Sequence, residues 1–110
     1  MVFAFIYWQR KTRLSRIALT ELRKLKADDD ITFAGELEHL LRRYAIARFG
    51  RDAVAALSGE RWIAFVVQHG GIALQGEIGA DFMRAAYGGT AAAHRAAWLS
   101  GAEGFIKGRS

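Results

Sequence analysis

The sequence predicts an all-α protein: a compact bundle of five or six helices that follows a basic N-terminal helix. Apolar residues recur at helical spacing through most of the chain, and no useful length alternates as a half-buried strand does. Proline is absent, so the 12 glycines alone punctuate the helices. Apolar residues make up 52% of the 110 residues, enough for one small core.

The first eight residues form an apolar stub before a basic segment. Val2–Trp8 (VFAFIYW) is too short to cross a bilayer, which takes about 20 apolar residues. Aromatic residues followed by QRKTR are typical of the cytoplasmic end of a membrane helix. Two interpretations compete: the end of a membrane span whose start is missing, or an N-terminus that packs on the core.

The segment from residue 9 to 27 is predicted to be a basic amphipathic juxtamembrane helix, continuous with the stub. Its helix is expected over Arg10–Lys26, with an apolar stripe of Leu14, Ile17, Ala18, Leu22 and Leu25. The net charge of +5 is concentrated here, because residues 1–26 carry seven Lys or Arg residues against one acid. We expect a membrane-surface site of Arg10, Lys11, Arg13 and Arg16, holding the helix along the cytoplasmic face.

Residues 28–110 are predicted to form the helical domain. The tri-aspartate Asp28–Asp30 supplies an N-cap for a helix over Ile31–Phe49, which Gly50 ends. A short helix over Arg51–Leu57 follows, and Ser58 is expected to cap a helix over Glu60–His69. The predicted core includes Leu41, Tyr44, Leu57, Trp62 and Phe65.

The C-terminal third is harder to divide into elements. Residues 70–79 (GGIALQGEIG) are expected to be a loop, followed by one or two helical turns over Asp81–Tyr87. Thr90 is expected to cap a final helix whose inner side carries Trp98, Ala102, Phe105 and Ile106.

No motif for catalysis, a cofactor or a metal is recognised. Gly71–Gly76 has the spacing of a phosphate loop, but Glu77 stands where the phosphate-binding lysine belongs. Glu36-x-x-His39 is half of a di-iron motif, and the other half is missing. The chain has no cysteine, and its three histidines lack zinc-site spacing. We expect neither catalytic nor cofactor-binding nor metal-binding residues, so the protein is not expected to be an enzyme.

Four arginines lie around the turn at Gly50. Arg48 is expected to compensate the partial negative charge at the C-terminus of its helix. Arg42, Arg43 and Arg51 are left as a possible binding site for an acidic partner. Aromatic residues are not interleaved with them, so a stacking platform for single-stranded nucleic acid is not indicated.

The run RRYAIARFGRDAVAALSGERWIAFV resembles the signature of a family of small bacterial proteins of unknown function. The pattern is carried by Leu41, Arg42, Arg43, Ala45, Ile46, Arg48, Phe49, Val54, Ala55, Leu57, Gly59, Trp62, Ile63 and Phe65. This chain differs in having Gly50 where proline is usual, and in lacking most of an N-terminal membrane span.

The resemblance implies a single-pass inner-membrane protein encoded beside MoxR-type AAA+ ATPases and von Willebrand factor A-domain proteins. It assigns no catalytic residue. The expected function is therefore a non-catalytic, membrane-tethered interaction module, with the helical domain on the cytoplasmic side of the bacterial inner membrane. The expected partners are a MoxR-type AAA+ ATPase or a von Willebrand factor A-domain protein, and an anionic membrane surface. No small-molecule substrate is expected. The alternative is a small basic helical protein that binds nucleic acid.

Overall fold

The structure, a computed structural model, describes the backbone of residues 2–108 and the side chains of residues 9–108. It contains the helices α1 (Val2–Arg23), α2 (Asp30–Phe49), α3 (Arg51–Ala55), α4 (Gly59–Gln68), α5 (Glu77–Ala86) and α6 (Arg95–Lys107), with a short 3-10 helix η1 (Ile72–Leu74). No strand occurs between residues 2 and 108. The predicted all-α fold is therefore confirmed.

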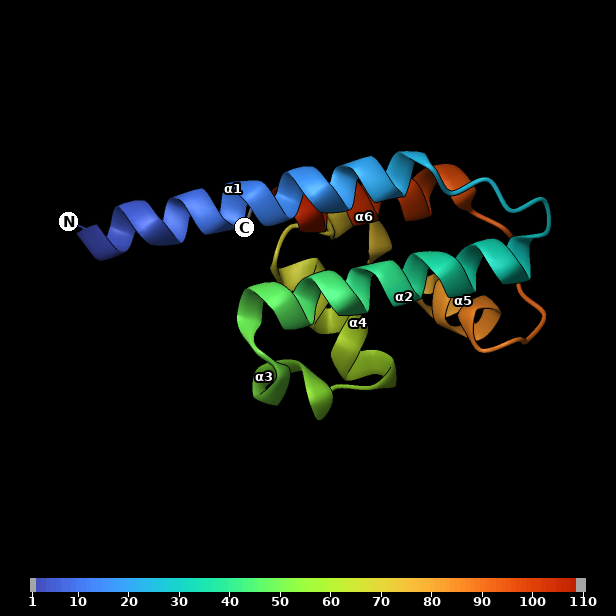
Figure 1. Cartoon of the computed structure of the whole chain (residues 1–110). Helices are drawn as coiled ribbons and strands as arrows, with labels where there is room; N and C mark the ends of the chain where they lie inside the picture. Colours follow the sequence, from blue (N-terminus) through green and yellow to red (C-terminus); the bar gives the residue numbers. More distant parts are fainter. Residues whose placement is uncertain (1, 109–110) are drawn as a thin grey trace.

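Helix α2 is the centre of the bundle. It packs against α1 on one side, against α5 on another, and against α6 and the short α3. Figure 1 shows α1 running alongside both α2 and α6, with α4 and α5 on the far side of α2 from α1. The first turns of α1 project beyond the rest of the bundle, and the molecule measures 48 × 27 × 20 Å.

The predicted ends of α2 are confirmed. The Asp29 carboxylate is the N-cap and accepts a 2.8 Å hydrogen bond from the backbone N–H of Thr32. That bond lowers the pKa of Asp29 below its ordinary value. Gly50 ends α2 with a φ of +94°, a conformation that side-chain-bearing residues rarely adopt. Ser58 lies at the N-cap of α4, but its hydroxyl makes no capping hydrogen bond.

Several predicted boundaries are wrong. Helix α1 ends at Arg23, before the expected Lys26, and α5 begins at Glu77, inside the expected loop. That loop also contains η1, whose Leu74 is fully buried. The reason is tertiary: the Ile78 carbonyl accepts a 3.1 Å hydrogen bond from Trp98 Nε1, which ties this segment to α6.

The final helix begins at Arg95 and not after Thr90. Arg95 donates hydrogen bonds to the Asp30 carboxylate (2.6 Å) and to the backbone carbonyls of Ala27 and Asp28. These contacts hold the first residue of α6 against the loop before α2. Long-range bonds of this kind outweigh the local capping preference of a threonine.

The core lies between α2, α4, α5 and α6. Of the predicted core residues, Leu41, Tyr44 and Trp62 are buried, while Leu57 and Phe65 are half-buried at its edge. The expected inner residues of the last helix are also buried: Trp98, Ala102, Phe105 and Ile106. Ile17, expected on the apolar stripe of the first helix, is exposed instead (53%).

Candidate functional site

The four predicted membrane-surface residues lie in the middle of α1, just after the turns that project from the bundle. Arg10, Arg13 and Arg16 are exposed and Lys11 is half-buried. Ala18 and Leu22, which follow Lys11 on the same face of α1, are buried against the core. Arg10 Nη2 donates a 3.3 Å hydrogen bond to the Ala47 carbonyl, so this side chain reaches the last turn of α2.

The C-terminal ends of α2 and α6 meet this part of α1. A Cβ atom on Gly108, which ends α6, would lie 2.9 Å from both Lys11 Nζ and Arg48 Nη1. Lys107 shares with Lys11 a surface cavity of about 280 Å³ that Thr12 and Ser15 also line. We call Arg10, Lys11, Arg48 and Lys107 the cationic end. Because helix C-termini carry partial negative charge, cations are favoured there.

Hydrogen bonds join the three helices at the cationic end. The Ser15 and Tyr44 hydroxyls both donate to the Ile106 carbonyl, at 2.8 and 2.9 Å. Arg48 Nη1 donates to the Tyr44 hydroxyl at 3.4 Å. As expected from the sequence, the charge of Arg48 lies in the last turn of α2. These bonds give the cationic end a defined geometry.

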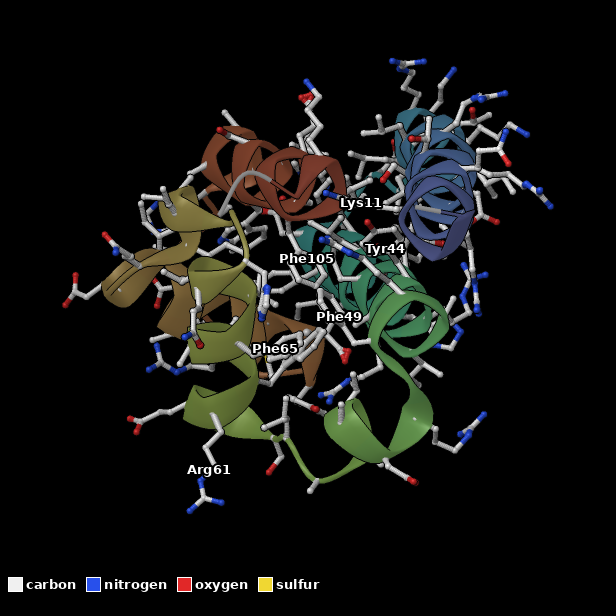
Figure 2. All side chains as sticks on the ribbon, turned by 90° about the vertical axis from the view of Figure 1, so that its left-hand side faces the viewer. Lys11, Tyr44, Phe49, Arg61, Phe65 and Phe105 are labelled. Carbon is white, nitrogen blue, oxygen red and sulfur yellow. The ribbon has the colours of Figure 1, made fainter. Side chains whose placement is uncertain are left out.

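Figure 2 looks onto this end of the molecule. Tyr44, Phe49, Phe65 and Phe105 gather between α2, α4 and α6, and Lys11 lies above them beside α1. The His69 ring packs at a tilt against the rings of Phe49 and Phe65, with centroid distances of 4.7 and 4.5 Å. Burial, and then the positive charge of Arg48, lower the pKa of His69 below its ordinary value. The neutral imidazole is therefore favoured in the fold.

The three arginines of the predicted partner site do not form one patch. Arg42 Nη1 donates a 2.6 Å hydrogen bond to the Leu57 carbonyl, and its guanidinium lies 4.1 Å from the centre of the Trp62 ring. Arg43 pairs instead with Glu21 of α1 at 3.5 Å. Arg51 is exposed just after α2. Arg42 therefore stabilises the fold, and only Arg43 and Arg51 are exposed to a partner.

An apolar groove that no sequence motif predicted lies between α4 and α5. It has a volume of about 490 Å³ and is lined by Gly59, Glu60, Ile63, Ala64, Val67, Gln75, Gly76, Ala80 and Met83. A signal for it was present: Trp62–Val67 are six consecutive apolar residues, more than one buried helix face requires. We call this feature the α4–α5 groove.

Across residues 2–108, no three His, Asp or Glu side chains come together as a metal site would require. None of the described helices combines the length and apolar character that crossing a bilayer takes.

Comparison with known proteins gives one match. A family model described as "Domain of unknown function (DUF4381)" matches residues 1–108, which is nearly the whole chain. No curated protein and no solved structure matches.

Proposed function

We propose that this chain, which belongs to the DUF4381 family, is a non-catalytic interaction module tethered to a membrane. The helical domain would lie on the cytoplasmic side of the bacterial inner membrane and present its surface to a protein partner. The resemblance described above supports a MoxR-type ATPase or a von Willebrand factor A-domain protein as that partner.

The observation that carries the membrane proposal is the course of α1. It is one unbroken helix from Val2 to Arg23, and its first turns project from the bundle at the cationic end. Residues 2–9 of α1 precede Arg10, whose side chain contacts α2, and extend about 12 Å at the rise of an α-helix. Residues 2–8 are apolar or aromatic, and basic residues begin at Arg10. An apolar segment seated in a bilayer would bring the cationic end to the lipid headgroups.

A continuous, projecting helix favours an upright orientation of α1 over one in which it lies flat on the membrane. Upright, Arg23 would lie about 20 Å further from the headgroups than Arg10. The attraction between charges at that distance and the anionic headgroups is largely screened, since the Debye length is about 8 Å at physiological salt. If α1 lay flat on the membrane, the cations at both ends of the basic segment would contribute equally to membrane binding.

Sedimentation of the full chain with liposomes tests the proposal at near-physiological salt. We expect stronger binding to liposomes rich in anionic lipid than to zwitterionic ones. Arg10→Gln with Lys11→Gln should weaken that binding about tenfold or more, since each cation near an anionic surface contributes about 1 kcal/mol. The matched variant Arg23→Gln with Lys24→Gln removes the same charge and should have little effect.

Competition with DNA distinguishes membrane binding from the alternative function, nucleic-acid binding. Phosphates attract the same cations, so weak binding to random duplex is expected and decides nothing. Binding of a defined DNA sequence at nanomolar concentration, without binding to anionic liposomes, would overturn the membrane proposal in favour of nucleic-acid binding. Equal losses in the two double variants would overturn the upright orientation only.

The partner class is tested separately. A purified MoxR-type ATPase and a purified von Willebrand factor A-domain protein, encoded in the same genome, should each be measured for binding to the full chain in liposomes. Saturable binding by one of them is expected. Binding by neither would remove this part of the proposal.

A further inference from the structure

The α4–α5 groove leaves an apolar helix face without a cover. Helix α4 buries Trp62 and Val66 completely, while Ile63, Ala64 and Val67 face the groove. A helix that is apolar on several sides is normally enclosed on several sides. Within the described residues, other helices cover α4 on its inner side only. A further element packed on its outer side would occupy the groove.

The groove has the shape of a seat for a helix. From α4 it is lined at Glu60, Ile63, Ala64 and Val67, one face over two turns. On the other side it is lined by Gly76, the N-cap residue of α5, and by Ala80 and Met83 within α5, again at the spacing of one helix face. Four of its lining residues are glycine or alanine (Gly59, Ala64, Gly76 and Ala80). Small residues let a third backbone approach closely, as in recognition of an amphipathic helix by a groove.

The charge of the groove selects among possible occupants. Glu60 is the one charged residue among those that line it, and it makes no ion pair within the described part of the chain. An anionic lipid surface would be repelled by this carboxylate. The residues that line the groove include no Lys or Arg, so a basic segment of a partner protein would be attracted to Glu60 without opposition from a cation of the groove itself. A basic partner segment is therefore the favoured occupant, and a second copy of the chain is an outcome of the test below.

We propose that the α4–α5 groove binds an amphipathic α-helix of a partner protein. Apolar side chains of that helix at i, i+3 or i+4, and i+7 would fill the groove, and a Lys or Arg would lie beside Glu60. This inference rests on the proposed role as an interaction module and names the chemistry of the partner.

A synthetic peptide provides the probe. A labelled 14-residue amphipathic helix, about 21 Å long, would carry leucines at the positions given above and lysines at both ends. Its binding to the full chain is followed by fluorescence anisotropy, without lipid. A peptide with glutamates in place of the lysines, and a scrambled peptide that breaks the apolar stripe, are the comparisons. We expect the lysine peptide to bind at least tenfold more tightly than either.

Two double variants locate the binding. Ala64→Gln with Ala80→Gln adds neutral bulk to two exposed alanines of the groove and should weaken binding of the lysine peptide about tenfold, a change of about 1.4 kcal/mol. Ala55→Gln with Ala96→Gln changes two exposed helical alanines elsewhere and should leave binding within about twofold. Glu60→Gln should reduce the preference for lysines over glutamates. Thermal melts confirm that all variants fold.

Three results would overturn the inference: equal binding of the scrambled peptide, equal binding by the groove variant and its control, or concentration-dependent dimerisation that the groove variant abolishes. The last result would assign the groove to a second copy of the chain. Because no lipid is present, failure here leaves the liposome result untouched, and failure of membrane binding leaves this result untouched.

Discussion

The two sides of α4 have similar composition and opposite surroundings. On the inner side, Trp62 and Val66 are fully buried, and the Trp62 ring meets Phe105 edge-on at a centroid distance of 6.1 Å. On the outer side, Ile63 and Val67 are half-buried and Ala64 is exposed. Apolar character therefore does not say which side of a short helix the chain itself will cover. Coverage depends on which other helices reach that side.

The inner side is closed by parts of the chain distant in sequence. Arg42 lies over the Trp62 ring and also holds the Leu57 carbonyl, which shields the indole from the α3 side. Trp62 Nε1 is buried without a hydrogen-bond partner among the described residues. Packing, and not hydrogen bonding, therefore holds this indole in place.

The largest expected effect on stability comes from truncating the indole on the inner side of α4. Trp62→Ala should lower the free energy of unfolding by about 3–5 kcal/mol, because it empties a fully enclosed indole site. Arg61→Ala, at the neighbouring position whose side chain points away from the bundle in Figure 2, should change it by less than about 0.5 kcal/mol. Urea denaturation measures both. Similar losses in the two variants would contradict the contrast between the sides of α4.

The next largest effect on stability is expected at Gly79, where α5 lies close to α4. A Cβ atom on Gly79 would overlap the Leu74 carbonyl oxygen and lie 2.8 Å from Ile63 Cγ2. Gly79→Ala should therefore cost about 1–3 kcal/mol through overpacking. At Gly35, in the second turn of α2, the nearest atom to a new Cβ is the Ala86 carbonyl oxygen at 3.7 Å. Gly35→Ala should stabilise the fold by up to about 1 kcal/mol, so opposite signs are expected in thermal melts.

The inner side should also respond to pH, through His69 at the end of α4. Its pKa is lowered in the fold, so below about pH 6.5, the ordinary value, the unfolded chain binds a proton that the folded chain resists. The stability that depends on the neutral imidazole is therefore present above pH 6.5 and is lost as pH falls toward the lowered pKa. Urea midpoints at pH 7.5 and 5.5 should differ more for the unmodified chain than for His69→Gln. Equal differences would show that other groups cause the pH dependence.

The smallest effect is expected on the outer side. Ala64→Gln with Ala80→Gln should change the free energy of unfolding by less than about 1 kcal/mol, since both alanines are exposed. The same variant is predicted to bind the lysine peptide about tenfold more weakly, a change of about 1.4 kcal/mol. A large loss of stability would show that the chain itself already covers this side of α4.

Local chemistry made some elements predictable. The start of α2 follows from Asp29, whose carboxylate needs only the Thr32 N–H three residues away. Its end follows from Gly50, because glycine tolerates a positive φ. The burial of Trp98 and Phe105 follows from apolar spacing along one helix. Each of these features depends on neighbours within about one helical turn.

Other features depended on contacts far apart in the chain. The start of α6 at Arg95 depends on Asp30, 65 residues away. Gly104 was also missed, although it lets α6 approach the backbone of Gly70 so closely that a Cβ atom would overlap its carbonyl oxygen. No pattern along α6 alone could show what its glycine faces. For the same reason, sequence alone could not separate Arg42, bound to Leu57 and Trp62, from exposed Arg43.

The sequence by itself determined that the chain is helical, where most helices lie, and that positive charge gathers near the N-terminus, because propensity, periodicity and charge are local properties. Only the tertiary structure decided which cations share one end of the molecule. Lys11, Arg48 and Lys107 come together because three helices end or pass at the same place. It also decided that one side of α4 is closed and the other open. Packing between helices depends on partners that no single stretch of sequence contains.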